Sequence, residues 1–303
     1  MKKQIPPLRH LIVLLLLSLT LPQYVHAQKD TDNGIFWEIS GNGLKRPSYL
    51  FGTYHLLGGA YVKKLPKVEA AFEAADGVVV ESEMDSSKLM QIMSIAIMKD
   101  KKLSDLMSKD EYDLLASEIQ RSIGTPVELM AQFKPTFIMV TLTVMYARAG
   151  SLSQLEEANG TSLDAYFAAE ARKKKKSVST FESMDEQMRL LVDHYPVEEQ
   201  ARQLVEFVKS KDEMAAVQEE LLTLYLRHDV KGLYELYQKY EKEFGDTSWL
   251  LDDRNENWMK QLPAMLEKGN LFIAVGALHL PGKKGLVELL RQQGYKVKVQ
   301  PVK

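Results

Sequence analysis

Short runs of aromatic and β-branched residues recur in the N-terminal part of the chain, over about 34–83. GIFWEIS, SYLFGT and GVVVESE are bounded by glycine, proline and asparagine, which is the pattern of β-strands. Between the second and third runs, the stretch 66–75 begins with proline and has apolar residues at helical spacing. A strand, a helix and a further strand in this order predict that the two strands run parallel.

The apolar spacing becomes helical over about 86–171 and again over about 184–268. Within the first block, Ser108 followed three residues later by Glu111 is a capping box, which predicts the start of a helix. Between the two blocks, the polar and β-branched stretch 177–183 predicts a short strand. Most of the predicted helix therefore lies in the middle of the chain.

The C-terminal part returns to strand patterns. LFIAVGALH, GLVELLRQQG and YKVKVQP predict a strand, a helix and a final strand. Strands near both ends predict an α/β fold, in which a mixed central sheet brings the two ends together and large helical insertions lie between them. Since no shift in composition marks a boundary, we expect one α/β domain over 28–303.

The first 27 residues have the three parts of a secretory signal peptide. MKKQIPPLRH is basic, LIVLLLLSLTL is an apolar run too short for a comfortable membrane span, and VHA suits a signal-peptidase site. The next most apolar segment, 137–149, contains three hydroxyl side chains and is expected to be a buried helix. We therefore expect an exported, soluble protein, periplasmic or extracellular, with no stable membrane insertion after signal cleavage.

Composition excludes several classes of function. The chain has no cysteine, which excludes disulfides, thiol catalysis and sulfur-based zinc sites. Removing the first 27 residues leaves 36 basic against 41 acidic residues, a net charge of −5, so nucleic-acid binding is not expected. The basic run 172–176 is explained by a helix C-terminus. The nucleophile-elbow, zinc-protease, phosphate-loop and dinucleotide-binding motifs are absent.

Two stretches at opposite ends of the chain repeat one spacing. Gly52 precedes His55 by three residues, and Gly276 precedes His279 by three, each after a predicted strand. Ligands of open α/β sheets bind at the carboxyl ends of the strands, so we expect the two imidazoles to meet there. Together they would form half of a metal site or an acid–base pair. The alternative is that each histidine only hydrogen-bonds within its turn.

Carboxylates follow two of the predicted strands. Glu81 ends a fully apolar strand, where a buried carboxylate needs a partner or a cation, whereas Glu83 is expected nearer to solvent. Glu182 is a similar strand-end acid. Arg254 and Asn255 lie just before the helix predicted over 258–268, where they would hold a substrate carboxylate or orient a metal ligand. The alternative is that the acidic and amide residues of this segment cap the helix.

FGTYH, VVVES, SLDAYFAAEA with VSTFES, DDRNENW and VGALHLPGKKGL follow one another along the chain. This order is typical of the TraB/GumN/PrgY family, which includes the Tiki proteases, and the chain resembles that family from about 36 to 299. Leu278 departs from the pattern, which commonly has a second glycine before the histidine. The departure leaves the glycine and histidine of the motif in place.

The resemblance implies a divalent-metal-dependent peptidase-like hydrolase acting on peptide or protein substrates. By position, His55 and His279 would be metal ligands or catalytic histidines, and Glu81 the matching glutamate. Further family positions are matched by Glu182, Arg254 and Asn255. Nitrogen and oxygen ligands suit zinc, manganese or cobalt, and either glutamate would take a proton from water while the arginine stabilises negative charge.

A second class of function stays open beside the enzyme. The wider superfamily includes haem-binding lipoproteins, so the chain is alternatively a binding protein that sequesters a peptide or haem without cleaving anything. A third hypothesis, a scaffold with a decayed site, is disfavoured because all the expected polar residues are present together.

Overall fold

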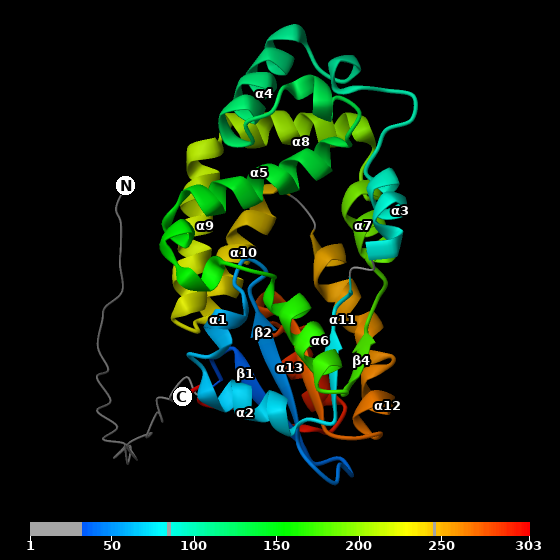
Figure 1. Ribbon diagram of the computed structural model, residues 1–303, viewed down its shortest axis with the longest axis vertical. Helices are drawn as coiled ribbons and strands as arrows, with labels where there is room; N and C mark the ends of the chain where they lie inside the picture. Colours follow the sequence, from blue (N-terminus) through cyan, green and yellow to red (C-terminus); the bar gives the residue numbers. More distant parts are fainter. Residues whose placement is uncertain (1–31, 84–85, 245–246) are drawn as a thin grey trace, which may run out of the picture. The chain divides into compact units, whose positions relative to one another are not determined.

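A six-stranded mixed β-sheet is the centre of the fold (Figure 1). The strands, in sheet order, are β4 (Ser177–Thr180), β3 (Gly77–Val80), β5 (Leu271–Gly276), β2 (Ser48–Thr53), β1 (Phe36–Ser40) and β6 (Lys296–Val299). The first four run parallel, and β1 is antiparallel to both of its neighbours. The sheet thus joins the two ends of the chain, which confirms the predicted α/β fold.

This is a computed structural model, and it describes residues 32–83, 86–244 and 247–303. Residues 32–303 form one compact unit. The predicted signal peptide, 1–27, lies outside the described part of the chain. Within that part, no helix combines the length and apolar character needed to cross a lipid bilayer.

The central strands are buried because helices cover both faces of the sheet. Every residue of β3 and nearly every residue of β5 is buried, which explains their continuous apolar sequences. Helices α2 (Pro66–Ala74) and α6 (Leu163–Lys173) lie on one face, and α13 (Leu286–Gln292) lies on the other (Figure 1). On the first face, Phe167 stands 4.7 Å from Phe272 between ring centroids, so aromatic packing fixes α6 against β5.

The helical insertions form a second, separate hydrophobic cluster around Ile119, Leu142 and Leu204. The capping box predicted at Ser108 is present, because its backbone N–H donates to Glu111 at 2.8 Å. The remaining α-helices of the described chain are α1 (Gly59–Val62), α3 (Leu89–Ile95), α4 (Lys109–Ser122), α5 (Pro135–Ala149), α7 (Met184–Asp193), α8 (Val197–Lys209), α9 (Lys211–Leu226), α10 (Val230–Phe244), α11 (Asp252–Met259) and α12 (Leu262–Leu266).

One predicted boundary is wrong. The single helix expected over 258–268 is two helices, and Arg254 and Asn255 lie inside α11 rather than before it. Pro263 lies in the first turn of α12, where its missing N–H costs nothing, so it begins a new helix. The alternative that the acidic residues cap the helix is also wrong, since the N-cap is Leu251 and makes no side-chain cap.

Candidate functional site

Three parallel strands deliver the predicted site residues to one edge of the sheet. Glu81 follows β3 directly, His55 lies two residues beyond β2, and His279 lies three residues beyond β5. A Cβ placed on Gly276 would lie 3.2 Å from Glu81 Oε1, 3.6 Å from His279 Cδ2 and 3.7 Å from His55 Nε2. The three side chains therefore surround one point, and a side chain at Gly276 would crowd it.

The other glycine of the repeated spacing has a packing role. A Cβ on Gly52 would lie 2.7 Å from Leu280 Cδ1 and 3.0 Å from the Cα of Ala277. Leu280 and Ala277 belong to the turn that carries His279. The missing side chain of Gly52 thus lets this turn pack directly against β2.

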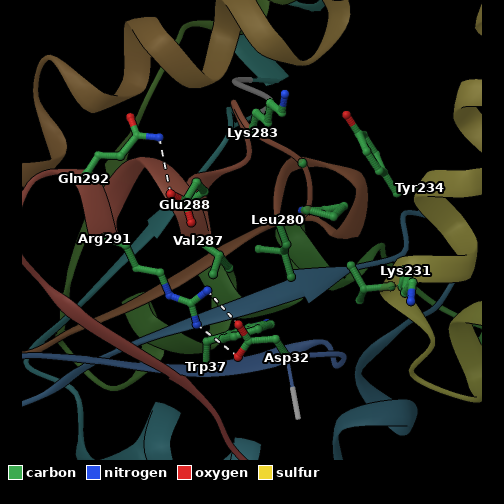
Figure 2. Close-up of a pocket in the computed structure, with 13 residues that line it drawn as sticks. Asp32, Trp37, Lys231, Tyr234, Leu280, Lys283, Val287, Glu288, Arg291 and Gln292 are labelled. Atoms are coloured by element: carbon green, nitrogen blue, oxygen red, sulfur yellow. Dashed lines mark hydrogen bonds and ion pairs between the residues drawn. The ribbon is translucent and has the colours of Figure 1, made fainter. Parts of the chain in front are cut away.

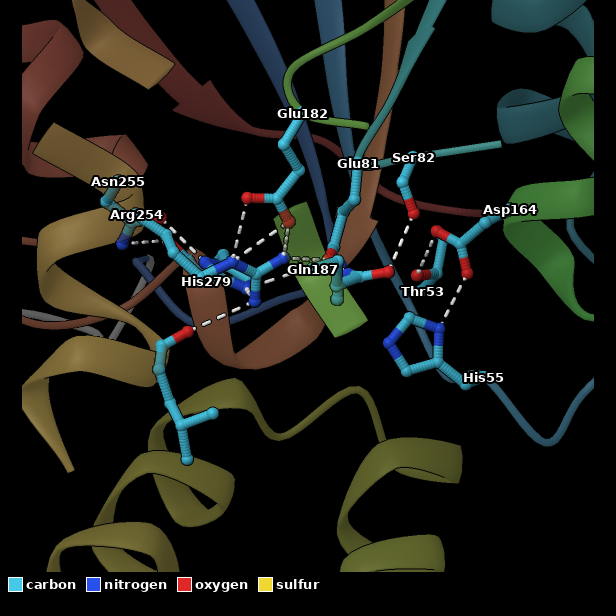
Figure 3. A network of polar contacts seen from close by, with 12 residues as sticks. Thr53, His55, Glu81, Ser82, Asp164, Glu182, Gln187, Arg254, Asn255 and His279 are labelled. Atoms are coloured by element: carbon cyan, nitrogen blue, oxygen red, sulfur yellow. Dashed lines mark hydrogen bonds and ion pairs between the residues drawn. The ribbon is translucent and has the colours of Figure 1, made fainter. Parts of the chain in front are cut away.

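Glu81 is 3% exposed and is held by three donors. The Gly276 N–H donates to Oε1 at 2.7 Å, while Arg254 at 2.6 Å and Gln187 at 3.1 Å donate to Oε2 (Figure 3). Burial alone raises the pKa of this carboxyl, but the charges of Arg254 and His55 and the hydrogen bond from Gly276 outweigh burial and lower the pKa to about 2. Glu81 is therefore an ionised carboxylate at neutral pH.

Arg254 is the centre of this network, with a side chain only 11% exposed. Its Nε donates to Glu182 at 3.1 Å, and its Nη1 donates to the carbonyl of Leu250 and to His279 Nε2, both at 3.1 Å. Its Nη2 donates to Glu81 and Glu182. A guanidinium has five N–H donors, and all five have acceptors here. In this arrangement Arg254 positions other side chains and has no donor left for a substrate.

His279 is buried and has both ring nitrogens in use. The amide nitrogen of Asn255 donates to the carbonyls of His279 and Lys284, at 3.2 and 2.9 Å, which fixes the orientation of the amide. Asn255 Oδ1 must then accept from Nδ1 at 2.7 Å, so Nε2 is the acceptor that faces Arg254. Burial, with help from Arg254 and His55, lowers the pKa of His279 to about 3. This imidazole is therefore neutral.

His55 has the opposite environment. Its Nδ1 donates to Asp164 at 2.8 Å, and Thr53 donates to the other oxygen of Asp164 at 3.0 Å. Desolvation opposes protonation, but Asp164 and then Glu81 raise the pKa of His55 to about 9. Because the His55 side chain is 61% exposed, solvent screens part of this attraction. Its Nε2 has no hydrogen bond to any described residue and faces the cleft.

Two contributors were missed from the sequence. Asp164, only 10% exposed, lies in the first turn of α6, where an acidic residue is explained by the helix dipole alone. Gln187 donates to Glu81 and accepts from Ser82 at 2.7 Å, but it lies on the predicted helix α7 among other polar residues. The only local signal is that Asp164 comes two residues after the N-cap Ser162, which places it in the first turn of a helix. This position does not reveal which strand end the helix faces.

A cleft of about 450 Å³ opens beside His55 and Glu81. Its rim carries Glu83, which pairs with Arg172 and is 26% exposed, in agreement with the expectation that this glutamate is nearer to solvent. The volume is within the range of small-ligand sites. The other lining residues are Ser82, Ser162, Asp164, Ala165, Ala168, Ala169, Met184 and Gln187.

The donor chemistry suits a divalent ion at His55 and Glu81. Ring nitrogens of metal-binding histidines are usually oriented by an acceptor on the other nitrogen, as Asp164 does for His55. His279 differs, because its Nε2 already accepts from Arg254. Among the described residues, no group of three histidine, aspartate or glutamate side chains is placed to hold a metal. An ion shared by all three predicted ligands would therefore require Arg254 to move.

A family model described as the TraB/PrgY/gumN family matches residues 35–299. The match begins at the start of β1 and ends with β6, so it covers the whole sheet together with the helical insertions. No curated protein and no solved structure gives a match to the chain.

Proposed function

The chain belongs to the TraB/PrgY/gumN family, and we propose that it is a divalent-metal-dependent hydrolase that cleaves peptide bonds in peptide or protein substrates. The observation that supports this most directly is the pairing of one free imidazole nitrogen, His55 Nε2, with the buried carboxylate Glu81 around Gly276. Both groups line the cleft. A scissile carbonyl and an attacking water that enter the cleft would meet the imidazole of His55, which can donate or accept a proton, and the fixed negative charge of Glu81.

The charge balance of the cluster favours an added cation. The cluster holds three carboxylates and one permanent cation: Glu81 and Glu182 pair with Arg254, and Asp164 pairs with His55. Buried charge of one sign is costly unless it is balanced, and in the metal-free chain the proton of His55 supplies the second positive charge. Metal ligands must lose their protons, so a cation at His55 Nε2 would take the place of that proton.

Each residue of the cluster then has a defined task. A divalent ion held by His55 and Glu81 would supply Lewis-acid activation of water and of the scissile carbonyl. Asp164 holds the His55 ring so that Nε2 faces the cleft. Arg254 keeps Glu81 ionised and in place. Gly276 leaves the space into which the reacting groups fit.

Metal content and cleavage of residues 28–303 test the proposal together. The chain is loaded separately with zinc, manganese and cobalt, the bound metal is counted, and a fluorogenic peptide library is digested. We expect metal-dependent cleavage that falls at least about a hundredfold in His55→Ala and Glu81→Gln. His194→Ala is the matched control, because His194 is exposed and stacks on Trp249 at 3.9 Å, outside the cluster. Absence of saturable metal binding at every loading would refute the metal-dependent reading.

One observation also supports the alternative that the chain is a sequestering binding protein, and the same variants test it. The His55 side chain is 61% exposed and its Nε2 has no partner among the described residues, which also suits an axial ligand of haem. A Soret band that appears on adding haem and is lost in His55→Ala, with no peptide cleavage, would favour a sequestering protein.

A further inference from the structure

A cavity of about 660 Å³ lies between α10, α13 and the loop 280–283, and it shares no lining residue with the cleft at His55 (Figure 2). The cavity is larger than the cleft and has no part in the chemistry proposed above. Its volume is that of a site for a small organic molecule.

The walls of this cavity are mostly apolar. Trp37, Leu280 and Val287 are 3%, 0% and 7% exposed and present their side chains to it. The Tyr234 ring closes another side, and a Cβ on Gly282 would lie 2.6 Å from its hydroxyl, so the loop and α10 touch here. An aromatic or acyl body would exchange water for these surfaces on binding.

Of the basic side chains around the cavity, Arg291 has an ion-pair partner among the described residues and Lys283 does not. Arg291 donates to both oxygens of Asp32, at 2.7 and 3.0 Å, and lies over the ring of Trp37, so this pair is neutralised internally. Lys283 is exposed and has no hydrogen bond or ion pair to any residue in the described part of the chain.

We propose that this cavity binds a small carboxylic acid with an apolar body. The carboxylate pairs with Lys283 at the mouth, and the body lies against Trp37, Leu280 and Val287. A carboxylate gives Lys283 the ion-pair partner that it lacks among the described residues. The site goes beyond the proposed hydrolase function and does not depend on a metal.

The loop that forms one wall also belongs to the polar cluster. Leu280 directly follows His279, and the side chain of Leu280 packs against Gly52. Asn255 binds the carbonyls of His279 and Lys284, on either side of the lining residues. A bound acid would therefore contact the segment that positions His279, so NMR signals of Leu280 are a natural reporter of occupancy.

Calorimetric titration with 4-phenylbutyrate and with its uncharged amide tests the site. The full chain from residue 28 is used, without added metal. We expect the acid to bind at one site and more tightly than the amide, and Lys283→Glu to weaken binding of the acid about tenfold while leaving the amide unchanged. Lys268→Glu is the control, since Lys268 is exposed, lies outside the cavity lining and has no ion pair within the described residues.

A second variant protects the test against misfolding. Val287→Trp fills the cavity and should abolish binding of both ligands, while circular dichroism shows whether the fold is retained. Methyl signals of Leu280 should move on titration, and those of Leu142 in the separate helical cluster should not. Equal binding of acid and amide, equal losses in the two lysine variants, or no saturable binding would each overturn the proposal, whatever the outcome for peptide cleavage.

Discussion

At the scale of single residues, Arg254 decides what the other polar groups can do. Its five N–H donors are divided among two carboxylates, one imidazole and one backbone carbonyl, and its guanidinium carbon lies 4.8 Å from the centre of the Trp258 ring. The residue was expected to hold a substrate or to stabilise negative charge. With every donor engaged, it can take a substrate carboxylate only by releasing one of these partners.

Removing this arginine should therefore damage stability more than a surface ion pair does. Arg254→Met would leave Glu81 and Glu182, whose side chains are 4% and 14% exposed, without their main cation. We expect the free energy of unfolding of the metal-free chain to fall by about 3 kcal/mol, as when one partner of a buried pair is deleted. Urea denaturation monitored by circular dichroism measures it.

The matched control is Arg172→Met. Arg172 pairs with Glu83 at the rim, where the two side chains are 61% and 26% exposed, and such a pair contributes up to about 1 kcal/mol. Equal losses in the two variants would mean that Arg254 is not the residue that holds the cluster together.

At the scale of elements, the sequence predicts the strands and the edge at which they end. The alternation of apolar runs with glycine and proline is a local signal, and β2, β3 and β5 follow it. The rule that parallel strands end at a common edge then brings His55, Glu81 and His279 together without knowledge of any contact. The sheet position of β5, between β2 and β3, was not predictable, because strand order depends on packing across the whole chain.

The sequence reveals less about the site residues that lie on helices. Asp164 and Gln187 reach Glu81 and His55 from α6 and α7, and nothing local tells which way these helices face. The helical state of Arg254 was also missed, since asparagine and aspartate are poor helix formers. Aspartates in the first turn of α11 interact favourably with the helix dipole, which offsets that low propensity.

The contact between β2 and the His279 turn provides a test at this scale. Gly52→Ala would place a Cβ 3.0 Å from the Ala277 backbone, which cannot yield without moving the turn. We expect a loss of about 1–3 kcal/mol in the free energy of unfolding and a shift of the His279 ring signals in NMR spectra. Gly34→Ala is the control, because its Cβ would meet only a methyl group of Val299. If the two variants lose the same stability and the ring signals stay in place, the packing role of Gly52 is wrong.

At the scale of the whole molecule, the two histidines should give stability an optimum near pH 6.5 in the metal-free chain. Between pH 6.5 and about pH 3, His279 binds a proton in the unfolded chain but not in the native protein, because burial lowers the pKa of the native ring to about 3. Acid therefore destabilises the fold. Glu81, with its pKa lowered to about 2, adds to this below its usual value of 4.5. Above pH 6.5, unfolded His55 loses a proton that the native ring keeps up to about 9, so stability falls there as well.

Urea unfolding between pH 4 and pH 9 measures this profile. His279→Gln should flatten the acid side, and His55→Gln should flatten the alkaline side, by less because solvent screens the exposed ring. Stability that rises steadily from pH 6.5 to pH 9 in the unmodified chain would contradict the environment assigned to His55.

The strand order also determines when the site can exist during synthesis. β5 lies between β2 and β3, and the outer strand β6 pairs with β1, yet β5 and β6 are made last. A nascent chain that has not reached residue 271 lacks the strand joining β2 to β3, so Glu81 has neither Gly276 nor His279 beside it. Translation must therefore pass residue 279 before His55, Glu81 and His279 can be brought to one edge of the sheet.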